Sequence, residues 1–144
     1  MKAPLLVVAG ALARDGRLLL TRRPDGDPLE GFWELPGGKV EPGETPETAL
    51  GREWREELGV GVEAPEPFTF VSGAPNGRHV TLLVYRVPSL DGEPSPLGVA
   101  EVRWATPEEA GRLRLLPADR PVVERLPLDE GGRFEAAGPP EGTP

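Results

Sequence analysis

The stretch of sequence that decides the fold runs from Gly37 to Val60 and reads GGKVEPGETPETALGREWREELGV. Its beginning is a glycine-rich loop, in which the backbone is exposed because glycine carries no side chain. Further on, Leu50, Trp54 and Leu58 recur every four residues, which places three apolar side chains on one stripe of a helix. The sequence therefore predicts a loop followed by an amphipathic helix.

The ends of this helix carry residues that favour them. Thr45 is a preferred N-cap residue, and Pro46 suits the first helical position. Gly59 suits the position just past the last turn, where a left-handed conformation is common. We therefore expect the helix to occupy residues 46–58.

Beside the apolar stripe lies an acidic face. Glu53, Glu56 and Glu57 are three and four residues apart, so their carboxylates share one side of the helix. Crowded carboxylates repel one another, and a hard divalent cation such as Mg²⁺, whose ligands are oxygens, relieves the repulsion. A solvated surface is the simpler explanation of an acidic helix taken alone, but the glycine loop in front of this one favours a metal site.

The whole pattern resembles the Nudix box. Every fixed position is filled: Gly38, five residues, Glu44, seven residues, Arg52-Glu53, the apolar Trp54, one residue, Glu56-Glu57, one residue, Gly59 and the apolar Val60. The resemblance covers about residues 4–127. It implies an α/β protein with the Nudix fold, an α/β/α sandwich with a central mixed β-sheet.

The resemblance also implies roles for individual residues. Mg²⁺, with Mn²⁺ as a substitute, would be held by carboxylates and one carbonyl, and one carboxylate would be the general base. The metal ligands would be Glu53, Glu56, Glu57 and the Gly37 carbonyl. The base would be Glu53, which could instead be a ligand, with Glu44 and Glu101 as alternative bases. Gly38 and Lys39 would lie at the substrate phosphates. Arg52 and Glu56 are one turn apart, so an ion pair between them would orient the carboxylates.

Two apolar strands are predicted before the box, over residues 5–13 and 18–21, joined by a turn at residues 14–17. The second strand ends in Thr21-Arg22-Arg23, whose guanidinium groups suit phosphate recognition or an ordinary surface. In MutT-like Nudix enzymes a Thr-Arg-Arg segment precedes the box with its second arginine near the substrate. The resemblance therefore makes Arg23 a substrate-binding candidate. Residues 32–36 form a short strand that lines the nucleotide site in the family or simply belongs to the core.

Several further elements are predicted after the box. Residues 68–71 and 79–87 indicate a β-hairpin, residues 88–98 a linker, residues 101–104 a strand, and Thr106-Pro107 the start of a second helix. We expect His79, the single histidine, to be structural. Many relatives recruit an acidic residue shortly before the tryptophan of this strand. Glu101 is the candidate here, although MutT-like spacing points to Gly98 instead.

Residues 115–126 resemble the closing segment of MutT-like and cytidine-triphosphate-cleaving relatives, in which a polar residue after Pro-Ala reads the base. The MutT pattern has asparagine at that position, and this chain has Asp119. An ionised aspartate only accepts hydrogen bonds, which suits an amino group or ring N–H of cytosine or a purine, whereas a protonated one also donates. The alternative is that Asp119 caps a helix before Pro121.

Composition excludes other classes of protein. The 144 residues fit one domain, predicted over residues 1–128, with a disordered tail over residues 129–144. The chain has no cysteine, which excludes disulfides and thiolate sites, and its net charge of −8 argues against a general nucleic-acid-binding surface. No stretch is long enough to span a membrane, and Pro4 and Gly10 interrupt the N-terminal apolar run, unlike a secretion signal. We therefore expect a cytoplasmic protein.

The resemblance predicts a MutT-like hydrolase that splits a nucleoside triphosphate, normal or oxidised, into a monophosphate and pyrophosphate. The hydrolase would bind a small-molecule nucleotide and neither a nucleic-acid polymer nor a membrane. The protein would act as a monomer or homodimer. An ADP-ribose or dinucleoside polyphosphate pyrophosphatase is the alternative, weakly supported by Pro75, which some ADP-ribose-cleaving relatives share. A nucleotide-sensing module is less favoured, because such modules typically lose box carboxylates and this chain keeps them.

Overall fold

The computed structural model describes residues 3–74 and 77–126. The strands are β1 (Leu5–Ala11), β2 (Ala13–Arg14), β3 (Arg17–Arg22), β4 (Trp33–Glu34), β5 (Gly37–Lys39), β6 (Gly61–Glu63), β7 (Glu66–Gly73), β8 (Val80–Arg86), β9 (Ser89–Asp91) and β10 (Glu101–Ala105). The helices are α1 (Pro46–Leu58), α2 (Pro107–Gly111) and α3 (Arg120–Arg125). The predicted tail and Pro75 lie outside the described residues. Among those that are described, no helix has the length and apolar character needed to cross a bilayer.

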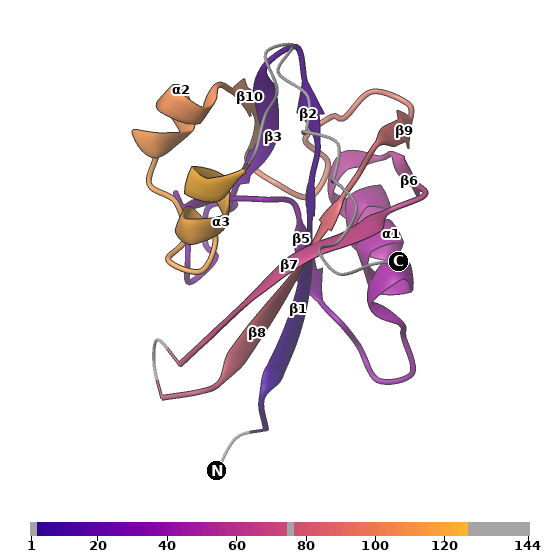
Figure 1. Ribbon diagram of the computed structural model, residues 1–144, viewed down its shortest axis with the longest axis vertical. Helices are drawn as coiled ribbons and strands as arrows, with labels where there is room; N and C mark the ends of the chain where they lie inside the picture. The colour runs from indigo at the N-terminus through magenta and orange to yellow at the C-terminus, as the bar shows by residue number, and fades with distance from the viewer. Residues whose placement is uncertain (1–2, 75–76, 127–144) are drawn as a thin grey trace, which may run out of the picture.

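A mixed sheet with the strand order β5-β1-β8-β7 occupies the centre of the molecule (Figure 1). Strand β1 runs parallel to β8 and antiparallel to β5, and β7 and β8 form an antiparallel pair. A second, antiparallel sheet has the order β10-β3-β2, with β4 also paired to β3. The central mixed sheet predicted from the resemblance is therefore confirmed, together with the hairpin of β7 and β8.

Alternating side chains of the strands face two separate cores, because successive residues of a strand point to opposite sides. In β1, Val8 belongs to the core under α1, whereas Ala9 belongs to the core that contains residues of α2 and α3. In β3, Leu19 and Leu20 divide in the same way. Helix α1 accordingly lies on one side of the strands and α2 and α3 on the other (Figure 1). This arrangement confirms the α/β/α sandwich.

Helix α1 has the predicted bounds. The Thr45 hydroxyl accepts a hydrogen bond from the Thr48 N–H at 3.1 Å, and Pro46 occupies the first turn. Gly59 ends the helix with φ of 70°, a conformation that glycine adopts without strain, and its N–H donates to the Arg55 carbonyl. The apolar stripe is buried as expected.

The structure differs from the prediction at two elements. The first strand ends at Ala11 rather than residue 13, because Ala13–Arg14 pairs with β3 in the second sheet. The turn between β2 and β3 is as predicted, with positive φ at Asp15 and Gly16. The predicted linker over residues 88–98 is wrong in part, since Ser89–Asp91 forms β9 and pairs with β6 just after α1. The second helix starts as predicted, with Thr106 in a capping box with Glu109.

Candidate active site

The glycine loop lies against β1 and α1 so closely that only glycine fits. A Cβ atom on Gly37 would lie 1.9 Å from the Val8 carbonyl oxygen, across the β1–β5 pairing. A Cβ atom on Gly38 would lie 2.4 Å from Cδ of the Glu53 carboxylate. The loop backbone and the acidic face of α1 are therefore in direct contact.

Arg52 ties the loop to the helix. Its Nε and Nη2 donate to the two carboxylate oxygens of Glu44 at 2.8 and 2.9 Å. Its Nη1 donates to Glu53 at 2.9 Å, and Nη2 also reaches the Lys39 carbonyl at 3.0 Å. The predicted pair with Glu56 is present but is longer, at 3.5 Å. Spacing along the helix therefore identified a more distant acidic partner of Arg52 than Glu44 or Glu53.

Glu44 is held in its ionised form. Besides Arg52, it accepts a hydrogen bond from the Glu41 N–H at 2.9 Å, and its side chain is only 15% exposed. These hydrogen bonds, the one from Arg52 above all, lower the pKa of Glu44 to about 2. A carboxylate with so low a pKa is a weak proton acceptor. This geometry suits Glu44 to positioning Arg52 rather than to the alternative role of general base.

The acidic face of α1 has two inner glutamates, Glu53 and Glu57, and one outer glutamate, Glu56. Burial and the neighbouring charges of Glu53 and Glu34 raise the pKa of Glu57 to about 8. Glu56 is more open, with 61% of its side chain exposed. The buried Glu57 thus lies among acidic neighbours, and a bound cation would relieve their repulsion.

The oxygen-only donor set of the loop and helix fits Mg²⁺. The Glu53 carboxylate lies beside the loop that carries the Gly37 carbonyl, and Glu57 interacts with Glu53. The described residues contain no ready-formed cluster of three or more acidic, histidine or cysteine side chains around one point. Mg²⁺ usually takes one or two protein carboxylates and keeps several waters, so an open acidic edge of this kind fits the ion.

Glu101 is engaged elsewhere. It forms ion pairs with Arg22 at 3.4 Å and with Arg103 at 3.1 Å. The segment that packs on α1 is three residues earlier: the Gly98 N–H donates to the Glu57 carbonyl at 3.0 Å. The structure therefore places a glycine where MutT-like spacing would put an additional acidic residue.

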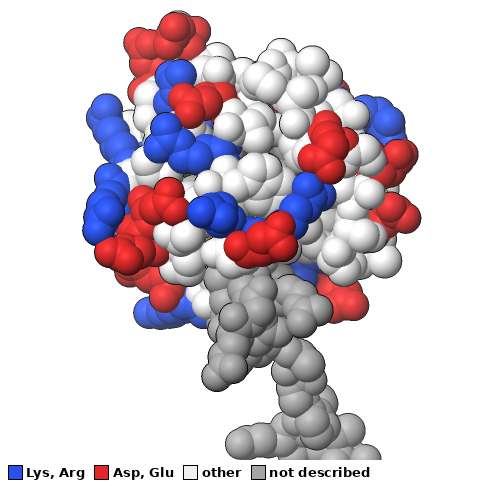
Figure 2. Space-filling view, turned by 90° about the horizontal axis from the view of Figure 1, so that it is seen from above, with Lys and Arg blue, Asp and Glu red and all other residues white. Residues whose placement is uncertain are grey.

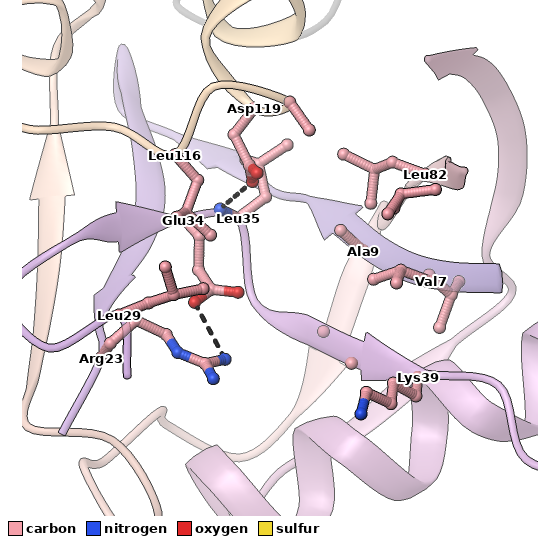
Figure 3. Close-up of a pocket in the computed structure, with 15 residues that line it drawn as sticks. Val7, Ala9, Arg23, Leu29, Glu34, Leu35, Lys39, Leu82, Leu116 and Asp119 are labelled. Atoms are coloured by element: carbon pink, nitrogen blue, oxygen red, sulfur yellow. Dashed lines mark hydrogen bonds and ion pairs between the residues drawn. The ribbon is translucent and has the colours of Figure 1, made fainter. Parts of the chain in front are cut away.

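A pocket of about 230 Å³ opens beside the glycine loop (Figure 3). Its walls are mostly apolar and include Val7 and Ala9 of β1 and Leu82 of β8. Four of its lining residues carry ionisable groups, namely Arg23, Glu34, Lys39 and Asp119. The pocket thus brings the predicted binding residues Arg23, Gly38, Lys39 and Asp119 to one cavity, together with Glu34.

Asp119 is buried at this pocket, with 4% of its surface exposed. Its Oδ2 accepts a hydrogen bond from the Leu35 N–H at 2.9 Å, as Figure 3 shows. Although α3 begins at the next residue, the Asp119 side chain makes no capping hydrogen bond, so the helix-cap alternative is wrong. Burial and then the charge of Glu34 raise the pKa of Asp119 to about 8, against the opposing effects of the Leu35 N–H and of Arg23.

Arg23 lies between two carboxylates. It binds Asp27 at 2.8 Å and Glu34 at 3.3 Å, and it lines the pocket, unlike a simple surface arginine. Glu34 is 14% exposed, and burial, partly offset by Arg23, raises its pKa to about 7. Glu34 lies outside the box and was not predicted as a site residue. The available signal was an acidic residue inside the apolar strand that leads directly into the glycines.

The outer surface mixes charges of both signs. Figure 2 shows Lys and Arg side chains interspersed with Asp and Glu over one face of the molecule. Elsewhere in the described residues, ion pairs join Arg14 to Glu93 and Arg112 to Glu108. A nucleic-acid polymer is bound by a clustered basic surface, which this face does not present among its described residues.

Comparisons with known proteins agree with this geometry. The model of the NUDIX domain family matches residues 4–126. The chain is 40% identical over 118 residues to the CTP pyrophosphohydrolase of Escherichia coli K12, covering 82% of this chain and 87% of that protein. It is 32% identical over 139 residues to the 8-oxo-dGTP diphosphatase of Haemophilus influenzae, covering 93% and 99%. The crystal structure of a MutT NUDIX hydrolase from Burkholderia pseudomallei matches with a TM-score of 0.77 at 33% identity, covering 87% and 99%. The chain therefore belongs to the NUDIX domain family, as a MutT-like Nudix hydrolase.

Proposed function

We propose that this protein is a Mg²⁺-dependent pyrophosphohydrolase that converts cytidine triphosphate, or its deoxy form, to the monophosphate and pyrophosphate. The base would occupy the pocket at Asp119, and the phosphates would run over the glycine loop toward the acidic face of α1. Support for this path comes from Gly37, Gly38 and Lys39, which line the pocket, and from Gly38, which also adjoins Glu53.

The size of the pocket supports this division of the substrate. Sites that enclose a drug-sized ligand usually have volumes of roughly 300–1,000 Å³, and this one holds about 230 Å³. It is therefore suited to a base and not to a whole nucleotide. The charged phosphates would remain outside, where the cation and Lys39 can reach them.

The residues of the box supply the catalytic groups. Glu53, Glu57 and the Gly37 carbonyl would hold the cation, with Glu56 at the outer edge. When bound, the cation neutralises the crowded phosphate oxygens. Glu53 would take the proton of the attacking water, while Arg52 holds the Glu53 carboxylate in place through its 2.9 Å hydrogen bond. Gly38 and Lys39 would bind the phosphates.

The observation that carries the choice of base is the buried Asp119 carboxyl. With a pKa of about 8, this group is mostly neutral at pH 7, so it offers one O–H donor beside one acceptor. Cytosine presents the complementary pair, a ring-nitrogen acceptor beside an amino donor. Guanine presents two adjacent donors on its corresponding edge, which suit an ionised carboxylate instead. Adenine presents the same pair, so neutral Asp119 favours cytosine or adenine over guanine. The similarity to a CTP pyrophosphohydrolase favours cytosine between these two.

An oxidised guanine nucleotide is the second candidate. The similarity to an 8-oxo-dGTP diphosphatase favours it, and ionisation of Asp119 on binding would create the double acceptor that guanine requires. Arg23 and Glu34, the other charged groups at this end of the pocket, influence that ionisation in opposite directions. The two candidates therefore differ in the protonation state that they require.

A hydrolysis panel at pH 7 and pH 9 tests both. The substrates are CTP, dCTP, dGTP, 8-oxo-dGTP, ADP-ribose and a dinucleoside polyphosphate, with Mg²⁺ present and products identified. We expect the highest kcat/KM for CTP or dCTP at pH 7, with monophosphate and pyrophosphate as products, and a higher KM at pH 9. Preference for 8-oxo-dGTP that increases with pH would establish the second candidate. Cleavage of ADP-ribose alone would refute both, and no cleavage at all would favour a sensing module.

A further inference from the structure

Trp54 makes a hydrogen bond that its position in the box does not require. The box needs only an apolar residue there, and Trp54 is fully buried in the core under α1. Its indole Nε1–H nevertheless donates to the Pro36 carbonyl at 2.8 Å. A leucine would fill the same core but would have no donor. The indole therefore links α1 to the residue that immediately precedes Gly37.

The Pro36 carbonyl is held from a second side. It also accepts a hydrogen bond from the Gly10 N–H of β1 at 2.9 Å. The bulk of the indole lies directly over Gly10: a Cβ atom there would be 2.6 Å from Trp54 Cζ2 and 2.9 Å from Val87 Cγ2. Any other residue at position 10 would displace the indole or the strand. Two independent observations therefore converge on one buried carbonyl.

This carbonyl lies at the junction of the loop and the helix. Its peptide unit includes the nitrogen of Gly37, and Trp54 directly follows Glu53 on α1. A peptide plane fixed by two donors cannot rotate without breaking one of them. The hydrogen bond from Trp54 thus sets the position of the Gly37–Gly38 backbone relative to the Glu53 carboxylate, which a Cβ on Gly38 would already touch.

We propose that Trp54 is a positioning residue: its indole N–H aligns the glycine loop with the acidic face of α1 for cation binding and turnover. The inference rests on the proposed function for its kinetic effect, but not for its effect on cation binding. Residues that orient metal ligands without touching the metal typically change metal affinity or activity by about 10–100-fold. The role of Trp54 is therefore measurable in both quantities.

The test is Trp54→Phe, which keeps an aromatic side chain in the core and removes the donor. The matched control is Trp104→Phe in β10, where the ring stacks under the Arg14 guanidinium with 4.8 Å between Cζ and the ring centroid. We expect Trp54→Phe to lower kcat by on the order of tenfold, with KM for the nucleotide changed less than about twofold. We also expect Mn²⁺ binding without nucleotide, measured by electron paramagnetic resonance, to weaken by on the order of tenfold. The control should match the wild type in all three quantities.

The outcomes separate the two proposals. A wild-type protein that hydrolyses no nucleoside triphosphate refutes the proposed function, whereas wild-type kcat and Mn²⁺ affinity in Trp54→Phe refute the role of Trp54. If Trp104→Phe lowers kcat and Mn²⁺ affinity as much as Trp54→Phe does, the role of Trp54 is also refuted.

If Trp54→Phe does not fold, hydrogen exchange of the Trp54 indole N–H in the wild type decides. Slow exchange that persists on adding Mg²⁺ supports the role, and rapid exchange overturns it. Gly10→Ala, which crowds the indole, should reproduce the Mn²⁺ defect.

Discussion

Arg52, in α1, and Glu44, just before the helix, are joined by two hydrogen bonds of 2.8 and 2.9 Å. The same guanidinium donates to Glu53 and to the Lys39 carbonyl. One side chain thus sets the relative positions of the loop, the helix start and the proposed base. Such a planar fork is specific to arginine, because an ammonium group is a single point of charge.

Arg52→Lys should therefore impair turnover while keeping the charge. Lysine can retain one of the carboxylate partners but not all of them, so we expect kcat to fall by on the order of 10–100-fold. Steady-state kinetics with the preferred nucleotide measures this effect. Arg55→Lys, an exposed change on the same helix, is the control and should leave kcat unchanged. Equal rates for both variants would contradict the positioning role of Arg52.

Glu53→Gln and Glu57→Gln should each lower kcat by at least about 10²-fold, since each removes a carboxylate from the proposed cation site or the base. Both variants should remain folded, which circular dichroism checks, because glutamine has nearly the same shape. Glu108→Gln, on the exposed surface of α2, serves as the control. Chelation of divalent cations by EDTA should abolish wild-type activity, and added Mg²⁺ should restore it. Rates like those of the wild type in both site variants would sink the assignment.

Asp119 should make stability depend on pH. Its pKa is raised from 3.8 to about 8 in the folded state, so the unfolded chain releases this proton first as pH rises. The free energy of unfolding should therefore be unaffected by this group below about pH 4 and should decrease between about pH 4 and 8, by at most about 1.4 kcal/mol per pH unit. Above about pH 8 this group causes no further decrease in the free energy of unfolding. Urea titrations of the wild type and Asp119→Asn measure the difference, since the variant lacks the titrating group. Parallel pH curves for the two proteins would show that Asp119 is not held neutral.

Asp119→Asn also tests recognition of the base. An amide offers a donor and an acceptor at every pH, as the neutral carboxyl does only below its pKa. We expect the variant to retain CTP hydrolysis at pH 7 and to lose the rise in KM that the wild type shows at pH 9. Asp119→Leu should raise KM or lower kcat/KM by about 10²-fold or more, because the hydrogen bonds to the base are lost. A wild-type kcat/KM for CTP in Asp119→Leu would exclude this residue from base recognition.

Removal of Arg23 should expose the cost of burying Glu34. Arg23→Ala leaves that carboxylate, which is 14% exposed, without its cation. We expect a loss of about 1–3 kcal/mol in the free energy of unfolding at pH 7 and a higher KM for the nucleotide. The double variant with Glu34→Gln should recover most of the stability but not the KM, because the charge is removed while the binding arginine is still missing. Full recovery of KM would show that Arg23 acts only through Glu34.

The sequence identified the elements of the site better than the contacts between them. Gly37, Gly38, Lys39, Arg23 and Asp119 line one pocket, and Glu53 adjoins Gly38; the catalytic and metal-binding roles of the α1 glutamates stay predictions. Glu34 was not recognised, since a single acidic residue in a short strand carries no periodic signal. Glu101 was placed correctly on a strand. Its arginine partners, however, are Arg22 on the neighbouring strand β3 and Arg103 on its own strand.

What the sequence determined by itself is the loop and helix from Gly37 to Gly59, with its cap, its buried stripe and its acidic face. These features depend on residues at most a turn or two apart, so local spacing is enough to specify them. Only the tertiary structure decided which groups share a site: Asp119 meets the Leu35 N–H from 84 residues away, and Trp54 shares the Pro36 carbonyl with Gly10. It also decided which carboxyl groups keep their protons, because burial and neighbouring charges, rather than residue type, set the pKa values of Glu34, Glu57 and Asp119.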